Sequence, residues 1–327
     1  MVQTAERVID LRVAGAAHAG PRPVMLAVAG DSASGKTTLA EGIRALLGEH
    51  RVTRICVDDY HRHDRSERER LGITPLHPEA NDLPAIERHL RALARGDAVD
   101  KPVYDHATGR HTDPVMVEPK EVVIVEGLLA LGTRGLRDCF DVSVYLEPEE
   151  ELRHRWKIAR DCEERGYEIA QVVADLRRRE RDSALYVRPQ AEHADVVVSF
   201  LRRTNPDAYA NLGARIALRP SLLSSELANV VRGIPGGGRR EPVRLARDRS
   251  LGTPVQVVEI DGDCPAVAGA AIEQAIWTRL GRPGLHRTNI GRYEHPSGDR
   301  RRSEALALTQ LLIVAHLSGS LRGALDL

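Results

Sequence analysis

The sequence predicts an α/β protein with a mainly parallel sheet flanked by helices and a smaller C-terminal α/β extension. Short apolar runs of the buried-strand type alternate with helical patterns over about two hundred residues, which is typical of a parallel sheet with both faces covered. The first apolar run leads through a glycine-rich turn into a helical pattern. After about residue 205 the pattern changes, which indicates where the extension begins.

The strands and helices of the main part are read from hydrophobic periodicity. Five apolar runs are expected to form strands, at 24–29, 53–57, 122–125, 142–146 and 195–200. Helices are expected at 36–47, 82–95, 149–165 and 169–181. In the segment 82–95, four leucine or isoleucine side chains recur at helical spacing and form one apolar face. Because strands and helices alternate, the strands are expected to run parallel.

Proline and glycine interrupt the C-terminal third, at Pro220, Gly236–Gly238 and Pro242. The charged segment 244–249 is expected to be an exposed connection. A further strand is expected at 255–260, and helices at 265–280 and 303–317. The predicted organisation is a leader at 1–22, the main α/β domain at 23–212 and the C-terminal extension at 213–327.

Length, charge and cysteine content limit the function classes. The chain has 327 residues, with 47 basic residues balanced by 47 acidic ones, so charge gives no case for binding nucleic acid or an anionic membrane. The longest apolar run, 305–317, has 13 residues and is too short to span a bilayer. The start of the chain lacks the apolar segment of a secretory signal, and the four cysteines lie far apart. We therefore expect a cytoplasmic protein without a nucleic-acid or membrane partner.

A phosphate-binding loop is the strongest local signal. Residues 30–37 match the pattern GxxxxGK[ST] at every fixed position, after an apolar strand and before a helix. The two glycines let backbone N–H groups point at phosphate oxygens, Lys36 is expected to reach the β- and γ-phosphates, and the Thr37 hydroxyl is expected to ligate Mg²⁺. The predicted nucleotide-binding residues are Gly30, Asp31, Ser32, Ala33, Ser34, Gly35, Lys36, Thr37 and Thr38.

Carboxylates at two other strand ends are expected to complete this site. Glu126 follows a buried strand and is expected to hold the metal, directly or through water. Asp58 and Asp59 follow the second strand, where a carboxylate can face the γ-phosphate and take a proton from an acceptor hydroxyl. Adjacent side chains cannot both point inward, so one aspartate is expected to be structural. His61 and Arg65 follow closely, and both suit an anionic group on the acceptor.

A charged cluster lies on the predicted helix 149–165. Lys157, Arg160 and Asp161 fall on one helical face, and Arg165 follows. A solvated face with local ion pairs is the alternative interpretation. However, only four of the 47 basic residues are lysines, and another of these is Lys36 of the phosphate loop. A lysine retained in such an arginine-rich chain favours a phosphate-handling patch, where a compact ammonium is needed.

Together these segments resemble the phosphoribulokinase and uridine kinase family of P-loop kinases, and within it the plant and cyanobacterial type of phosphoribulokinase most closely. The resemblance covers about residues 24–200 in order and with the family's spacing. It rests on the segments 58–61, 72–82, 101–109, 125–128, 156–161 and 191–195. The region 255–277 and the last helix are similar to a divergent version of the family's C-terminal segment.

The resemblance implies an ATP- and Mg²⁺-dependent transfer of the γ-phosphate to the C1 hydroxyl of ribulose 5-phosphate, in a protein that forms a homodimer. It implies that Asp58 is the catalytic base, that Lys36 and Arg160 act on the transferring phosphoryl group, and that Asp161 orients its neighbours. Glu126 would be the acid near Mg²⁺. The residues implied for the sugar phosphate are His61, Arg65, Tyr104, His106, Lys157 and Arg165.

Three alternatives stay open: a uridine kinase, a kinase for another sugar phosphate, and a nucleotide-binding regulator without catalysis. Uridine carries no phosphate, so Lys157, His61 and Arg65 would then lack a purpose. One departure from the plant enzymes concerns regulation. Their inactivating disulfide joins a phosphate-loop cysteine to one at the position of Cys56, but Ser34 stands at the loop position here. Redox control through this bridge is therefore expected to be absent.

Overall fold

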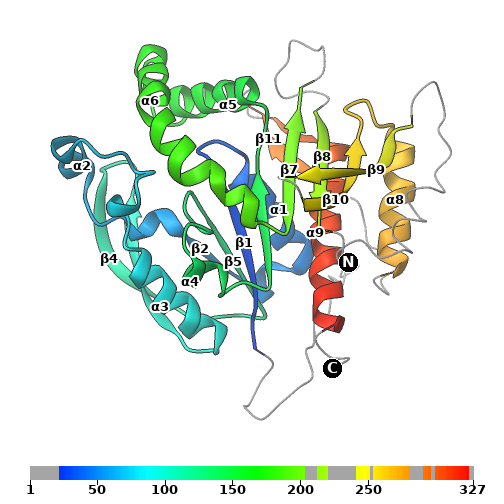
Figure 1. Ribbon diagram of the computed structural model, residues 1–327, viewed down its shortest axis with the longest axis horizontal. Helices are drawn as coiled ribbons and strands as arrows, with labels where there is room; N and C mark the ends of the chain where they lie inside the picture. The colour runs from blue at the N-terminus through cyan, green and yellow to red at the C-terminus, as the bar shows by residue number, and fades with distance from the viewer. Residues whose placement is uncertain are drawn as a thin grey trace, which may run out of the picture.

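The fold was analysed in a computed structural model that describes residues 22–202, 212–219, 241–250, 253–279, 290–295 and 299–323. A central eight-stranded sheet has the order β2-β5-β1-β6-β7-β8-β10-β9 (Figure 1). Its strands are β1 (Val24–Gly30), β2 (Val52–Cys56), β5 (Val122–Gly127), β6 (Val142–Leu146), β7 (Val196–Leu201), β8 (Gly213–Leu218), β9 (Val243–Ser250) and β10 (Thr253–Ile260). The predicted leader, and the predicted breaks at Pro220 and Gly236–Gly238, lie outside the described residues.

The five strands predicted from apolar runs form the parallel part of the sheet, which confirms the predicted fold class. Neighbours in the order β2-β5-β1-β6-β7 pair in parallel. Every residue of β1, β5 and β6 is buried. These strands are mostly apolar, without an alternation of apolar and polar residues, because helices or connecting segments cover both faces. Their carboxyl ends therefore meet at one edge of the sheet, where α/β proteins of this kind bind ligands.

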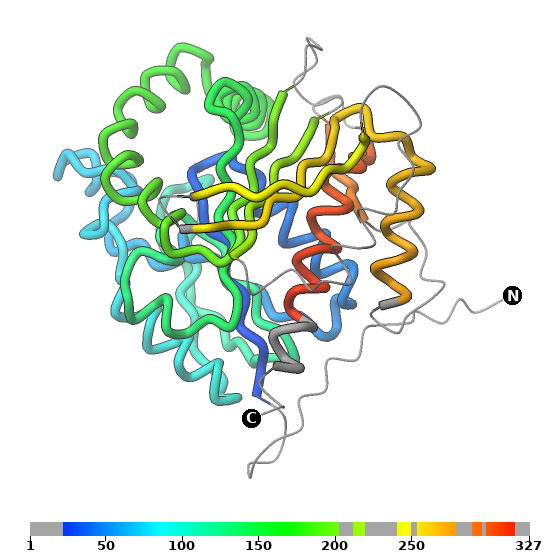
Figure 2. Tube along the Cα trace, turned by 45° about the vertical axis from the view of Figure 1, so that its right-hand side comes forward, coloured from blue at the N-terminus to red at the C-terminus, as the bar shows by residue number. Residues whose placement is uncertain are grey.

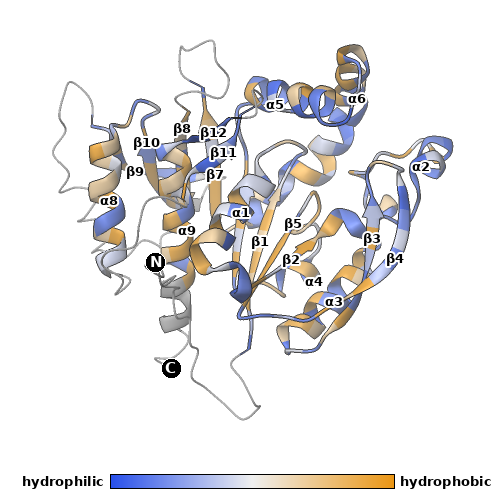
Figure 3. Ribbon diagram, turned by 180° about the vertical axis from the view of Figure 1, so that it is seen from behind, coloured by the Kyte–Doolittle hydropathy of each residue, from blue (hydrophilic) through white to orange (hydrophobic). Residues whose placement is uncertain are grey.

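Helices pack on both faces of the sheet and enclose two apolar cores. The longer helices are α1 (Lys36–Leu47), α3 (Leu83–Ala94), α5 (Glu150–Glu163), α6 (Ile169–Asp182), α8 (Ala266–Arg279) and α9 (Glu304–Gly323). Helices α1, α8 and α9 contribute to the core on one face, and α3 contributes to the core on the other. Figure 3 shows the apolar character of the central strands and of α9. Within the described residues, no helix combines the length and the apolarity that crossing a membrane requires.

The segment 244–249 corrects one sequence prediction, because it belongs to strand β9 and is not a connection. β9 pairs antiparallel with β10 along its whole length. It is the last strand in the sheet order, so one of its edges has no neighbouring strand among the described residues. Such an edge tolerates charged side chains, which form cross-strand pairs here: Arg244 with Glu259, and Asp248 with Arg215. The sequence pattern was therefore too polar to indicate a strand.

The strands after residue 212 continue the sheet of the main part. β8 pairs antiparallel with β7, and β10 pairs antiparallel with β8. The predicted extension therefore adds three strands to the same sheet, together with α8, α9 and the small ribbon of β11 (Arg292–Glu294) and β12 (Arg300–Arg302). The domain boundary at residue 212 stays a prediction.

A hairpin of β3 (Val99–Asp105) and β4 (Arg110–Val117) was not predicted from the sequence. Nearly all of β4 is exposed, so the strand lacks the apolar run that identifies the buried strands. The hairpin forms a sheet of its own, and in Figures 1 and 3 it lies beside α3 and the short helix α2 (Arg65–Leu71), away from the C-terminal strands. It contacts the turn after β2, which carries the two predicted aspartates.

The C-terminal helix α9 packs against α1, the helix that follows the phosphate loop (Figure 2). The buried Gln310 of α9 accepts a hydrogen bond from Gly291 N at 2.8 Å and donates one to Thr38 O at 3.3 Å. The two helices come close enough that a Cβ atom at Gly42 would lie 1.8 Å from Gln310 Nε2. The extension therefore supports the helix that carries the phosphate loop.

Gly42→Ala should lower the free energy of unfolding by about 1–3 kcal/mol, because the added methyl group displaces a hydrogen-bonded, buried side chain. In a Gln310→Ala background the same change should raise stability by up to about 1 kcal/mol, since alanine is the better helix former. Urea denaturation of the four variants measures this difference. An equal effect in both backgrounds would contradict the proposed close contact.

Candidate active site

The phosphate loop joins β1 to α1 through backbone conformations that favour glycine. Gly30 has φ 148° and Gly35 has φ 92°. A Cβ atom at Gly30 would lie 2.7 Å from Leu146 O, so a side chain does not fit there. Lys36 Nζ donates hydrogen bonds to the carbonyl oxygens of Gly30 and Asp31 at 3.0 and 2.7 Å, and burial lowers the pKa of this lysine. The loop thus has the shape and the cation that a polyphosphate requires.

Thr37 and Glu126 meet directly beneath this loop. The Thr37 hydroxyl donates to Glu126 Oε2 at 2.9 Å. Glu126 is buried on β5, where its register partners are Val28 of β1 and Cys56 of β2. A hydroxyl and a carboxylate are oxygen ligands that Mg²⁺ prefers, and in this arrangement both lie beside the phosphate loop. The donor set therefore fits the predicted metal.

The two aspartates after β2 have different surroundings. Asp59 accepts a hydrogen bond from Tyr104 N at 3.0 Å and forms an ion pair with Lys101, so it holds the β3–β4 hairpin. In the described part of the chain, no side chain or N–H group donates a hydrogen bond to the Asp58 carboxylate. Asp58 instead interacts electrostatically with Lys36 and His61. Asp59 is therefore the structural member of the pair, and Asp58 is available for chemistry.

Burial makes His61 a neutral side chain. Its Nδ1 lies 2.8 Å from Asn81 Oδ1. The Asn81 amide donates to the carbonyl oxygens of Pro75 and His77, so its Oδ1 accepts and His61 Nδ1 carries the proton. Burial lowers the pKa of His61 to about 4, although Asp58 opposes this shift. A neutral imidazole can still exchange hydrogen bonds with an anionic acceptor, so the role of His61 at the acceptor stays a prediction.

Tyr104 and Arg65 organise the turn of the hairpin. The Tyr104 hydroxyl donates to Gly109 O at 3.0 Å and accepts from Arg68 Nη2 at 2.8 Å. Arg65 Nη2 donates to His106 O at 2.6 Å. Both predicted acceptor residues thus form hydrogen bonds within the protein, and these bonds hold the turn of the hairpin. Arg68 was not singled out from the sequence, because nothing there distinguishes it from the neighbouring arginines.

His106 connects the hairpin to the other predicted residues. Its ring packs edge to face against Tyr104, with the ring centroids 5.2 Å apart. Desolvation lowers the pKa of His106, while the ring interacts electrostatically with Asp58, Arg165 and Arg160. The structure therefore brings the hairpin, the turn after β2 and helix α5 together around one space.

Asp161 forms ion pairs with three cationic side chains, two of them on α5 and one just beyond its C-terminal end. It forms an ion pair with Lys157, and its Oδ1 lies 2.8 Å from Arg160 Nη2 and 3.4 Å from Arg165 Nη1. Lys157 is 2% exposed and Asp161 is 3% exposed. Burial, and secondarily the nearby Arg179, lowers the pKa of Lys157 to about 8. One carboxylate cannot neutralise three cations, so the cluster retains positive charge that suits an anionic group.

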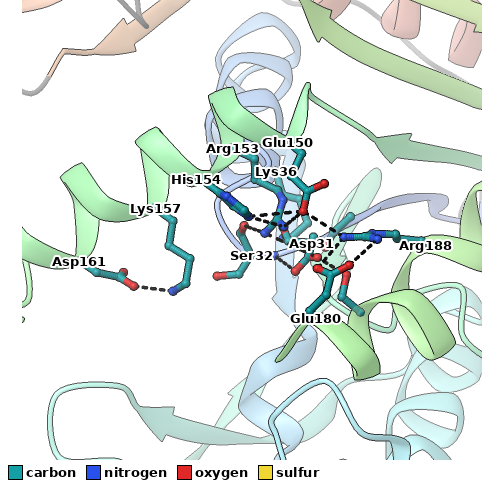
Figure 4. A network of polar contacts seen from close by, with 12 residues as sticks. Asp31, Ser32, Lys36, Glu150, Arg153, His154, Lys157, Asp161, Glu180 and Arg188 are labelled. Carbon is teal, nitrogen blue, oxygen red and sulfur yellow. Dashed lines mark hydrogen bonds and ion pairs between the residues drawn. The ribbon is translucent and has the colours of Figure 1, made fainter. Parts of the chain in front are cut away.

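Hydrogen bonds and ion pairs surround Asp31 and Ser32 of the phosphate loop, and Figure 4 shows these contacts beside the Lys157–Asp161 pair. Arg153 on α5 lies 3.6 Å from Asp31 Oδ2 and donates to Ser32 O at 3.4 Å. Ser183, just after α6, also donates to Asp31. Arg160 Nη2 donates to Ser32 Oγ at 3.3 Å. Sequence reasoning missed Arg153 and Ser183, because an arginine in an arginine-rich chain and an isolated serine give no distinguishing signal.

Cys56, at the end of β2, lies among carboxylates. Burial raises the pKa of its thiol, and the charges of Asp58, Asp59 and Glu126 raise it further. All four cysteines are free thiols. Ser34 stands at the phosphate-loop position where the plant enzymes have a cysteine, and it is fully buried. The absence of redox control through this bridge stays a prediction from the sequence.

Comparisons with known proteins agree with this geometry. A model described as "Phosphoribulokinase / Uridine kinase family" matches residues 25–205. Phosphoribulokinase of Synechocystis sp. is 41% identical over 180 residues, which cover 55% of this chain and 54% of that protein. Uridine kinase of Brevibacillus brevis is 34% identical over 213 residues, which cover 64% of this chain and 94% of that protein. The chain spans about half the length of the curated phosphoribulokinases it matches.

A solved structure supports the fold. The structure of phosphoribulokinase from Rhodobacter spheroides aligns with a TM-score of 0.57 at 18% identity, over 79% of this chain and 97% of that one. The alignment extends well beyond the family-matched segment, so part of the C-terminal extension shares the architecture of that protein.

Asp59→Ala should lower the free energy of unfolding by about 3 kcal/mol, because it leaves the buried ammonium of Lys101 without its partner and removes the acceptor of Tyr104 N–H. In a Lys101→Met background the loss should be clearly smaller. Urea denaturation of the single and double variants checks this coupling. Strictly additive losses would show that the two side chains do not depend on each other.

Proposed function

Because the chain belongs to the phosphoribulokinase / uridine kinase family, we propose that it is an ATP- and Mg²⁺-dependent kinase that converts ribulose 5-phosphate to ribulose 1,5-bisphosphate. The observation that carries the choice of acceptor is the cluster of Lys157, Arg160 and Arg165 around the buried Asp161, next to the phosphate loop. Such a cluster suits an acceptor that already carries a phosphate.

The nucleotide side of the proposed reaction uses the phosphate loop. Backbone N–H groups of residues 30–38 and the Lys36 ammonium would hold the β- and γ-phosphates of ATP. Mg²⁺, held by Thr37 and Glu126 directly or through water, would neutralise charge on these phosphates. Arg160 is bonded to Asp161 and to Ser32, which supports the proposal that its guanidinium would stabilise charge on the transferring phosphoryl group.

Asp58 is the proposed general base. As the C1 hydroxyl oxygen forms its bond to the γ-phosphorus, the bond from that phosphorus to the bridging oxygen breaks and ADP leaves. The hydroxyl proton goes to the Asp58 carboxylate, which accepts no other hydrogen bond from the described residues. Lys36, which interacts electrostatically with Asp58, keeps that carboxylate close to the phosphates.

The acceptor is proposed to lie between the hairpin and α5. Lys157 and Arg165 would bind its phosphate, and neutral His61 would exchange hydrogen bonds with a sugar hydroxyl. Arg65, Tyr104 and His106 would shape the pocket around the sugar. A homodimer, which rests on the family resemblance, and a cytoplasmic location, which rests on the charge, apolar-run and cysteine pattern of the sequence, are further proposals.

Uridine kinase activity is the second candidate, because the match to the Brevibacillus brevis uridine kinase covers 94% of that protein. Kinases for other sugar phosphates and a silent regulator are the remaining alternatives. Asp58, Lys36 and Glu126 are all in place, which argues against a silent regulator. Coupled ADP release with ribulose 5-phosphate, uridine and ribose 5-phosphate at equal concentration separates these functions. Preference for ribulose 5-phosphate supports the proposal; preference for uridine or ribose 5-phosphate, or no release with any acceptor, rejects it.

Asp58→Asn should lower turnover by roughly 10²–10⁴-fold, because the amide cannot accept the proton of the attacking hydroxyl. The affinity for ATP should stay nearly unchanged, since the phosphate loop is intact. Steady-state kinetics and nucleotide titration check both expectations. Near-normal turnover would assign the base to another residue.

Lys157→Met should raise the KM for the sugar phosphate far more than the KM for ATP, since the variant removes a cation from the acceptor side. In the unmodified protein this KM should also rise as the pH increases through about 8, where Lys157 loses its proton. The acceptor phosphate is already a dianion there, because its second pKa is about 6. Lys157→Arg should remove this pH dependence, and an unchanged dependence would exclude Lys157 as its source.

A further inference from the structure

Arg54, in the middle of β2, connects the predicted metal side of the site to helix α1. One of its terminal nitrogens pairs with Glu41 on α1 and the other pairs with Glu126 on β5. Strand register explains the second contact. Arg54 lies two residues before Cys56, whose register partner is Glu126, so the two side chains project from the same face of the sheet.

The Glu126 carboxylate is fully engaged in this arrangement. Its Oε1 accepts from Arg54, and its Oε2 accepts from the Thr37 hydroxyl at 2.9 Å. The side chain is 6% exposed, so water screens its charge only slightly. The guanidinium of Arg54 is therefore a cation in direct contact with Glu126, while Lys36 also interacts electrostatically with this carboxylate.

The second partner of Arg54 is already balanced by another arginine. Arg44 Nε donates to Glu41 Oε2 at 2.8 Å. The four side chains thus form a chain of alternating charge, Arg44–Glu41–Arg54–Glu126. Arg44 also pairs with Glu49 at 3.3 Å, but that carboxylate is 70% exposed, so water screens its charge. Since Arg44 compensates Glu41, the charge of Arg54 remains available to compensate Glu126.

We propose that Arg54 is a positioning residue that prevents the site from holding a divalent cation without nucleotide. This inference rests on the proposed role of Glu126 beside Mg²⁺. A free carboxylate next to a hydroxyl attracts a divalent cation, but Arg54 occupies one carboxylate oxygen and cancels the charge. Among the described residues, no group of three or more His, Cys, Asp or Glu side chains could hold a metal ion. In this proposal phosphate oxygens and water supply the remaining ligands, so that metal and nucleotide enter together.

Binding of Mn²⁺ to the nucleotide-free protein, followed by electron paramagnetic resonance, tests this role directly. Arg54→Met keeps the length of the side chain and removes its charge, and it should bind Mn²⁺ at least tenfold more tightly than the unmodified protein. Arg54→Lys should restore weak binding. Arg44→Met is the matched control: it removes a guanidinium from the same chain of charges without a contact to Glu126, so it should raise Mn²⁺ affinity far less than Arg54→Met does.

The double variant Arg54→Met/Glu126→Gln should lose the gain in affinity, because the gain depends on the uncompensated carboxylate. Unchanged Mn²⁺ affinity in a folded Arg54→Met protein overturns the proposal, as does a gain that persists in the double variant. Thermal melting establishes that each variant is folded, and Arg54→Gln replaces Arg54→Met if the latter does not fold. The measurement uses neither ATP nor an acceptor, so its outcome is independent of which substrate the protein phosphorylates.

Discussion

The turn between β1 and α1 leaves no room for a side chain at Gly30, and the position of the site depends on this constraint. The close approach of the loop to Leu146 O seats the phosphate loop on the carboxyl edge of the parallel sheet. Glu126 and Asp58 reach the same edge from the strands on one side of β1. Helix α5 reaches it from β6 on the other. A side chain at this position would lift the loop away from all three.

The local motifs were predictable because their chemistry lies in consecutive residues. The glycine spacing placed the phosphate loop and helix 36–47, and that helix has these bounds in the structure. Properties that depend on distant partners could not be predicted. The neutral state of His61 comes from burial and from Asn81, the structural role of Asp59 comes from a hairpin that the pattern did not indicate, and β9 is a strand only because β10 lies beside it.

Charge is distributed unevenly within the site, and this distribution matches the proposed binding of the acceptor on one side and of the metal on the other. On the acceptor side, three cations share Asp161 and leave a surplus of positive charge. On the metal side, Arg54 balances Glu126, so little net charge remains. The acceptor side is thus positively charged before the anionic acceptor binds. The metal side carries little net charge, which suits a divalent cation that binds together with the negatively charged nucleotide.

The contact between Gln310 and helix α1 means that the segment up to residue 205 cannot be separated from the last helix without loss. The family match ends at residue 205, which suggests a unit that could be cut out and exchanged. In the fold, however, α9 covers apolar side chains of α1 and bonds to a carbonyl of the phosphate-loop helix. A chain cut at residue 205 would lack α9 and expose that apolar surface to water, which would promote aggregation. Chimeras made from members of the family should therefore exchange the catalytic segment and the last helix as one piece.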